Sequence, residues 1–137
     1  MDAVMHAEAG GEVRFEAHPR LADVALLTLS HPGKFNAMSR AMWRDLKALA
    51  GGWPRIPDLR CVVLQGADGH FCAGGDIAEY PGFRFDEAHL RDFHENDVWG
   101  ALGALRLRLS ECAPFRCAWM GLAAYLPAGI LPSTPLT

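Results

Sequence analysis

A buried strand that runs directly into a cluster of glycines constrains the fold of this chain more than any other feature. Arg60 to Gln65 (RCVVLQ) is a short apolar run typical of a strand buried on both faces. Four glycines follow it within ten residues: Gly66, Gly69, Gly74 and Gly75. Glycine tolerates the positive φ angles that let successive N–H groups point the same way. The segment FCAGGDI, Phe71 to Ile77, is therefore predicted to form a turn whose backbone can stabilise an oxyanion. A surface turn that needs glycine only for tightness would have the same composition.

The residues before this turn predict two strands and a helix. Val13 to Ala17 alternate between apolar and polar residues, and Val24 to Leu29 (VALLTL) form a short apolar run, so both are predicted strands. Ser39 is a candidate N-cap for a helix whose buried face includes the apolar residues of Met42 to Leu49. The glycines at Gly51-Gly52 are predicted to end that helix.

The residues after the turn predict two further helical segments. Ile77 to Tyr80 suit one short helical turn, stopped by Pro81-Gly82. Asp86 opens a longer helical pattern with acidic residues in its first turn, which suits the helix dipole. Its predicted inner face comprises Leu90, Phe93, Asp97, Ala101, Ala104 and Leu105. The order strand, strand, helix, strand, helix predicts an α/β fold.

Two motifs at a fixed separation carry a family resemblance. His31 to Ser39 (HPGKFNAMS) is followed, a helix and a strand later, by Val62 to Tyr80 (VVLQGADGHFCAGGDIAEY). Together they resemble the crotonase superfamily, which includes enoyl-CoA hydratases and isomerases. The resemblance covers roughly Val13 to Arg106. It implies the N-terminal portion of a crotonase-like spiral of repeated ββα units. The matching positions are Pro32, Asn36, Ala37, Met38, Ser39, Gly66, Phe71, Cys72, Ala73, Gly74, Asp76 and Ile77.

The resemblance also implies a role for particular residues. Gly75 would donate one of the two backbone N–H groups of an oxyanion hole, which holds the carbonyl oxygen of an acyl-CoA thioester. Asn36 would shape the neighbouring turn. The residues expected to lie along coenzyme A are Lys34, Phe35, Ala37, Ala73, Gly74, Asp76 and Ile77. Coenzyme A enters as part of the substrate, so neither a separate cofactor nor a metal is expected.

The resemblance ends near Arg106, which divides the chain into a family-like part, residues 1–106, and a divergent tail, residues 107–137. The family's second oxyanion donor and its catalytic carboxylates belong to a later segment that the tail does not match. We therefore expect a truncated or frameshifted crotonase, with any shift near residues 106–109, that turns over little substrate. The alternative is a catalytically inactive fragment that at most binds coenzyme A weakly.

A third hypothesis belongs to another class of protein. An α/β nucleotide-binding module could use Gly66 to Gly75 as a phosphate loop. The sequence has neither G-x-G-x-x-G nor G-K-(S/T) there, so this hypothesis is disfavoured.

Composition and the absence of certain motifs restrict the cellular location and the binding partners that we expect. The formal net charge of −3 argues against nucleic-acid binding. None of the cysteines, Cys61, Cys72, Cys112 and Cys117, has C-x-x-C spacing, which fits free thiols in a reducing compartment. The N-terminal residues do not match a signal peptide, and no apolar stretch is long enough to span a membrane. A cytoplasmic protein is expected. Crotonases commonly form homotrimers or hexamers, but the supporting contacts lie largely beyond the matched part.

Overall fold

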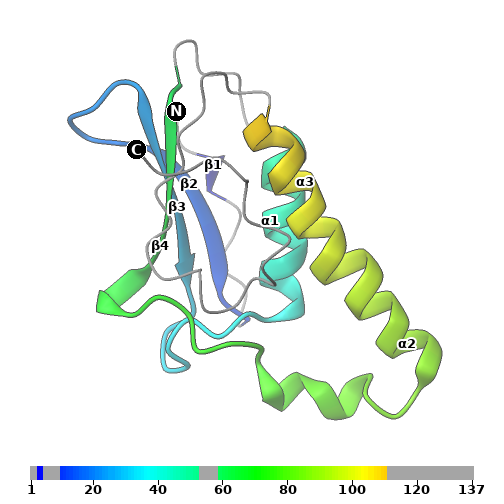
Figure 1. Cartoon of the computed structure of the whole chain (residues 1–137). Coiled ribbons are helices and arrows are strands. Elements are labelled where there is room, and N and C mark those ends of the chain that lie inside the picture. The colour runs from blue at the N-terminus through cyan, green and yellow to red at the C-terminus, as the bar shows by residue number, and fades with distance from the viewer. Residues whose placement is uncertain (1–2, 5–9, 53–58, 111–137) are drawn as a thin grey trace, which may run out of the picture.

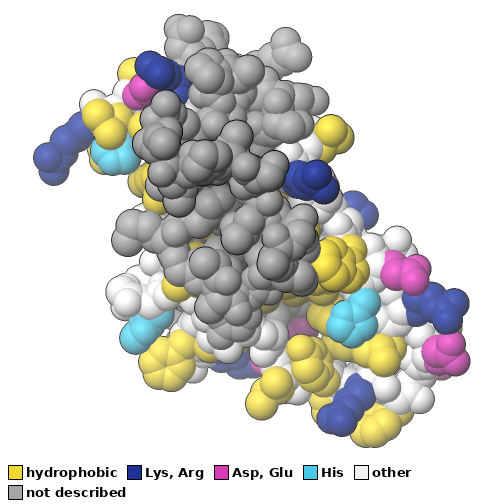
Figure 2. All heavy atoms as spheres, in the orientation of Figure 1, with side chains coloured by type: hydrophobic (Ala, Val, Ile, Leu, Met, Phe, Trp, Pro, Cys, Tyr) yellow, Lys and Arg dark blue, Asp and Glu magenta, His cyan; other side chains and the backbone are white. Residues whose placement is uncertain are grey.

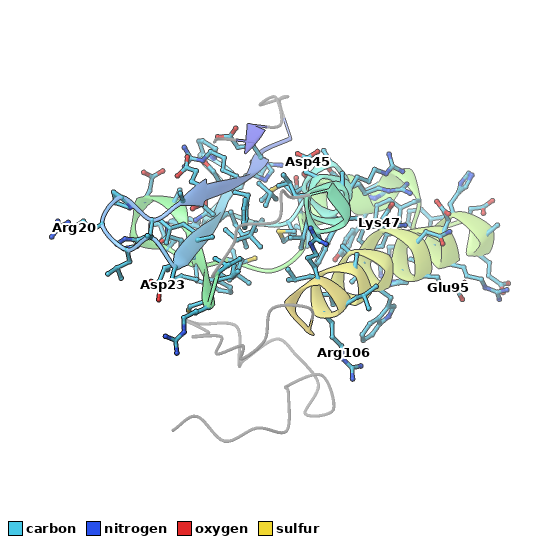
Figure 3. All side chains as sticks on the ribbon, turned by 90° about the horizontal axis from the view of Figure 1, so that it is seen from above. Arg20, Asp23, Asp45, Lys47, Glu95 and Arg106 are labelled. Carbon is cyan, nitrogen blue, oxygen red and sulfur yellow. The ribbon has the colours of Figure 1, made fainter. Side chains whose placement is uncertain are left out.

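The computed structural model describes residues 3–4, 10–52 and 59–110, and these form an α/β arrangement (Figure 1). A sheet lies on one side of the molecule, α1 packs beside it, and a long helical segment lies against α1. Viewed from above, Arg20 and Glu95 mark opposite ends of the molecule (Figure 3). The predicted fold class is therefore confirmed for the described residues.

Among the described residues, the sheet has four strands in the order β1-β2-β3-β4: Ala3–Val4, Glu12–Ala17, Val24–Ser30 and Cys61–Gly66. The pairs β1-β2 and β2-β3 are antiparallel, whereas β3 and β4 are parallel with Leu29 opposite Gly66. Because β3 and β4 end at the same edge of the sheet, the turns that follow them meet there. This parallel pair positions the candidate site.

Helix α1, Arg40–Gly52, begins and ends where the sequence predicts. The hydroxyl oxygen of Ser39 accepts a hydrogen bond from the N–H of Met42 at 3.1 Å, so Ser39 is the N-cap. Met42, Leu46 and Leu49 are all buried, which confirms the predicted inner face. They pack against the sheet in one hydrophobic core with Val13, Phe15, Leu27 and Val62.

Burial along β4 alternates, and this corrects one expectation. Val62 and Leu64 are buried, but Cys61 and Val63 are only half-buried. The prediction of a strand buried on both faces is therefore wrong for one face. The core cluster packs against the face that Val62 and Leu64 form.

From β4 to Ser110, the last described residue, the chain contains five helical pieces. They are η1 (Ala67–Gly69), η2 (Ile77–Gly82), α2 (Glu87–Asp92), the π-helical η3 (Phe93–Val98) and α3 (Trp99–Ser110). The carboxylate of Asp86 accepts from the N–H of His89 at 2.9 Å, which confirms the predicted helix start. η2 is a 3₁₀ helix that continues through Pro81 to Gly82, so the predicted stop after Tyr80 is two residues early.

The π-helical turns of η3 explain an unusual spacing on the inner face. Phe93, Asp97, Ala101 and Leu105 are all buried, at steps of four residues. An α-helix has 3.6 residues per turn, so a series at steps of four drifts around its axis. The wider π turns reduce that drift and keep all four side chains on one side. The sequence pattern predicts a regular helix here and does not indicate the π segment.

Most of the predicted divergent tail, residues 107–137, lies outside the described residues. α3 continues to Ser110, and residues 111–137 lie outside the described residues, so the expected divergence or frameshift stays a prediction. Within the described residues, no helix is long and apolar enough to cross a membrane.

Figure 2 shows charged side chains gathered at the end of the molecule that α2 forms, where Glu87, Arg91 and Glu95 are exposed.

Candidate functional site

Two turns lie side by side at the edge where β3 and β4 end. The N–H of Met38 donates to the carbonyl of Gly74 at 2.7 Å, and the N–H of Asp76 donates to the carbonyl of Met38 at 2.9 Å. The N–H of Ala73 donates to the carbonyl of Phe35 at 3.0 Å. The two sequence motifs therefore form one structural unit, held together by their backbones.

The backbone of Gly75 faces away from this contact. Met38 and Gly75 form an isolated parallel bridge, in which Met38 bonds to the residues on either side of Gly75. The N–H and carbonyl of Gly75 itself therefore point to the opposite side. No described residue accepts a hydrogen bond from the Gly75 N–H, and Gly75 is exposed. A free backbone donor thus lies at the position that the motif predicts.

The two adjacent glycines are required for different reasons. Gly74 has a φ of +113°, which an L-residue rarely adopts. Gly75 does not have a positive φ, but a Cβ built on it would lie 2.3 Å from the hydroxyl oxygen of Tyr80. A side chain at position 75 would therefore require the end of the Tyr80 side chain to move.

Asn36 joins the first turn to the loop that follows β4. Its side chain is buried and its φ is +58°. The amide nitrogen donates to the carbonyls of Ala67 at 2.8 Å and His70 at 3.1 Å, and the amide oxygen accepts from the N–H of His31 at 3.0 Å. Asn tolerates the left-handed conformation better than most residues. Asn36 therefore fixes the shape of both loops, in line with its predicted role.

Lys34 and Asp76 form an ion pair across the two turns. The ammonium of Lys34 lies 3.0 and 2.8 Å from the carboxylate oxygens of Asp76, which is buried. Asp76 also accepts from the N–H of Ala78 at 3.2 Å and so caps η2. Burial alone would raise the pKa of Asp76, but its hydrogen bonds to Lys34 and Ala78 and the charges of Lys34 and His31 lower it overall.

This lowered pKa predicts an acid-sensitive fold. Because the pKa of Asp76 is lower in the folded chain than the ordinary 3.8, its stabilisation is fully present well above pH 3.8 and is lost as the pH falls below it. We expect the free energy of unfolding, measured by urea titration across this range, to depend less on pH in Asp76→Asn and Lys34→Met. Unchanged pH profiles in both variants would contradict this role for the pair.

An apolar cavity of about 290 Å³ adjoins the Gly75 turn. The turn contributes Phe71, Cys72, Gly74 and Gly75 to its wall, and burial raises the pKa of the Cys72 thiol, which favours the neutral form. No carboxylate, histidine or lysine is among the described residues that line it. The other lining residues are Leu29, Met38, Trp43, Leu46, Leu64, Val98, Trp99, Leu102 and Leu105.

The structure brings the predicted site residues together around the paired turns. Ala37 is buried, with its carbonyl 2.7 Å from the Nδ1 atom of His31, whereas Ala73 is exposed. Phe35 and Ile77 are 63% and 76% exposed, which is high for apolar side chains of this size. Phe35 makes an edge-to-face contact with His70, with ring centroids 4.9 Å apart.

Sequence analysis missed a polar network beside the site. The buried carboxylate of Asp97 accepts from the guanidinium groups of Arg40 at 2.8 Å and Arg44 at 3.1 Å. The Arg40 backbone N–H donates to the carboxylate of Glu79 at 2.9 Å, which links α1 to η2. A polar Asp97 in an otherwise apolar helix face was the available signal, but the sequence did not indicate its partners. Among the described residues, no cluster of three or more potential metal ligands occurs.

Comparison with known structures identifies the fold. The chain is similar to Pseudomonas aeruginosa AtuE, with a TM-score of 0.58 and 33% identity over 78% of this chain and 38% of that one. It is also similar to an enoyl-CoA hydratase of Mycobacterium smegmatis, with a TM-score of 0.55 and 26% identity over 78% of this chain and 38% of that one. The crotonase-like fold is therefore confirmed for the matched part.

Comparison with known sequences identifies the family. The chain is 44% identical to mevalonyl-coenzyme A hydratase SIDH of Beauveria bassiana over 57 residues. This match covers 42% of this chain and 20% of that protein. The chain is 36% identical over 74 residues to the mitochondrial 3-hydroxyisobutyryl-CoA hydrolase of Rattus norvegicus, 47% of this chain and 19% of that protein. Both matches thus span about a fifth of the relative's length. A sequence model of the enoyl-CoA hydratase/isomerase family matches residues 24–112, so the chain belongs to that family.

Proposed function

We propose that the paired turns bind an acyl-CoA thioester and that the Gly75 N–H donates a hydrogen bond to its carbonyl oxygen. The observation that carries this proposal is the free N–H of Gly75, which points away from the contact with Met38 at the wall of the apolar cavity. Family membership supports a thioester ligand, because the related hydratase and hydrolase are both named for coenzyme A substrates.

A backbone donor suits this chemistry. The thioester oxygen gains negative charge when the α-carbon is deprotonated or the β-carbon is attacked. An N–H held in place by the rest of the fold stabilises that charge without reorganising. Removal of one such donor from an enzyme typically costs about 3–4 kcal/mol of transition-state stabilisation. Gly75 is therefore the residue to which we assign the central role.

The surroundings of Gly75 suit the two ends of the ligand. The cavity beside the turn offers an apolar environment to an acyl chain, and its volume of about 290 Å³ fits a short one. Exposed apolar side chains such as Phe35 and Ile77 would be covered by the coenzyme A moiety. The Lys34 ammonium donates hydrogen bonds to both carboxylate oxygens of Asp76, and its third N–H is available to a phosphate. Ala37, Ala73 and Gly74 would complete the coenzyme A contacts through backbone and turn shape.

The proposed reaction is of the hydratase or isomerase type, but the described residues favour binding over turnover. No described residue that lines the cavity can act as a general acid or base at neutral pH, because the Cys72 thiol there has a raised pKa. Nearby carboxylates are already engaged, Asp76 by Lys34 and Asp97 by two arginines. The specific alternative is thus a catalytically inactive protein that binds coenzyme A weakly. A cytoplasmic location, assembly into homotrimers or hexamers, and the absence of nucleic-acid binding stay predictions.

Calorimetric titration with butyryl-CoA and with free coenzyme A tests this proposal. We expect the acyl group to strengthen binding, and we expect Gly75→Pro to abolish that gain because proline has no N–H. Gly75→Ala, which also places a Cβ against Tyr80 but keeps the N–H, is the matched control and is expected to retain more of the gain. Circular dichroism establishes that the variant is folded, and hydration of crotonyl-CoA, followed separately, distinguishes an enzyme from a binding protein. Equal affinity of the wild-type chain for butyryl-CoA and coenzyme A would refute the proposed carbonyl contact.

A further inference from the structure

The hydroxyl group of Tyr80 lies beside the proposed carbonyl site. Tyr80 belongs to η2, and its side chain extends back to Gly75, where a built Cβ would lie 2.3 Å from the hydroxyl oxygen and 3.2 Å from the ring carbon that bears it. Standard bond lengths and angles place a Cβ about 2.5 Å from the nitrogen of its own residue. The Tyr80 oxygen is therefore within roughly 5 Å of the Gly75 nitrogen.

Packing fixes the ring of Tyr80, and no described residue hydrogen-bonds to its hydroxyl. The ring makes edge-to-face contacts with Phe83 and Phe93, with centroids 5.5 and 6.2 Å away. Phe83 and Phe93 are themselves buried and stacked on each other 4.5 Å apart. None of the hydrogen bonds among the described residues involves the Tyr80 hydroxyl. A phenol held in position without a partner has its donor available for a ligand.

One ligand oxygen can accept hydrogen bonds from both groups. An oxygen atom that lies about 2.9 Å from each of two donors can bridge donors separated by as much as 5 to 6 Å. Tyr80 is absent from the cavity wall, so its hydroxyl would meet the carbonyl end of an acyl group at Gly75 rather than the chain inside the cavity. Phenolic O–H groups serve as oxyanion donors in enzymes in general.

We propose that the Tyr80 hydroxyl is a second hydrogen-bond donor to the thioester carbonyl held by the Gly75 N–H. This inference rests on the proposed function, since it requires an acyl-CoA at the turn. It makes Tyr80 a substrate-contacting residue in addition to Gly75. It also gives the described part of the chain a two-donor carbonyl site of its own.

Tyr80→Phe tests the inference because it removes one oxygen atom and keeps the ring that packs on Phe83 and Phe93. The ligand is butyryl-CoA with a ¹³C-labelled carbonyl, and the measurements are its dissociation constant and the infrared carbonyl stretch of the bound thioester. We expect the dissociation constant to rise roughly three- to tenfold in the variant. We also expect a smaller downshift of the carbonyl frequency on binding, because one donor is lost.

Two controls separate a ligand contact from a structural effect. Binding of free coenzyme A is expected to be the same in Tyr80→Phe and wild type. Phe85→Leu, which alters an exposed aromatic side chain just after η2 but keeps both the Tyr80 hydroxyl and the rings that pack on it, is expected to retain the full frequency downshift. If wild type binds butyryl-CoA and Tyr80→Phe matches it in affinity and frequency, the inference alone is overturned. If wild type gains nothing from the acyl group, the inference and the proposed function both fail.

Discussion

Gly66→Ala is expected to lower the free energy of unfolding by more than about 3 kcal/mol. A Cβ on Gly66 would lie 1.9 Å from the carbonyl oxygen of His70 and 2.2 Å from that of Phe71. Both contacts are with backbone atoms, so no side-chain rotation can relieve them. The φ and ψ of Gly66, −106° and 148°, are ordinary extended values, and the requirement for glycine is therefore purely one of space. Such a loss is a large fraction of the 5–15 kcal/mol that is typical of a folded domain.

Urea unfolding followed by tryptophan fluorescence measures this change, and Gly103→Ala is the matched control. Gly103 lies in α3 with nothing within 4 Å of a built Cβ, so alanine there is expected to stabilise the helix by roughly 0.5–1 kcal/mol. The same substitution should thus act in opposite directions at the two positions. If Gly66→Ala is as stable as wild type, the backbone of His70 and Phe71 does not lie against Gly66.

Asn36→Ala is expected to destabilise the chain by about 3–5 kcal/mol. Buried polar groups lose their hydrogen-bond partners, and alanine adopts the left-handed backbone conformation of this position less readily than asparagine. The Asn36 amide bonds to the carbonyls of Ala67 and His70 and to the N–H of His31. All three bonds disappear in the variant. The affinity for acyl-CoA is expected to fall as well, since the released turn carries Phe35 to Met38.

Asn36→Gly separates the two causes. Glycine also loses the three hydrogen bonds, but it accepts the φ of +58° without strain. We expect it to be more stable than Asn36→Ala by roughly 1 kcal/mol in the same unfolding measurement. A variant Asn36→Ala with wild-type stability would show that the three hydrogen bonds contribute nothing to the fold.

Local sequence patterns were sufficient to predict most of the fold. Three confirmed predictions depend only on neighbours along the chain. They are the strand from the alternation in Val13 to Ala17, the N-cap at Ser39 and the buried face from the apolar spacing in α1. The paired motifs identified the family for the same reason, since each motif is contiguous. The start of the last helical segment at Asp86 was predicted from its capping pattern.

Features that depend on contacts distant in sequence could not be predicted in this way. Asp97 is satisfied by Arg40 and Arg44 from α1, more than fifty residues away, and it lies in a π-helical segment that no local pattern indicates. The steric role of Tyr80 at Gly75 depends on how η2 folds back, which no local pattern specifies. The motif predicts a donor role for the backbone of Gly75 but does not indicate that Tyr80 fills the space beside it.

The amide resonance of Gly75 in a ¹⁵N-labelled chain tests the central claim most directly. Titration with butyryl-CoA is predicted to move the Gly75 amide proton downfield, because its N–H gains a carbonyl acceptor, whereas free coenzyme A is predicted to leave it nearly unchanged. The amide of Gly51, which lies at the end of α1 with neither of its sequence neighbours in the cavity wall, serves as the internal control and should not respond to either ligand. A Gly75 resonance that responds equally to butyryl-CoA and to free coenzyme A, or to neither, would contradict the account.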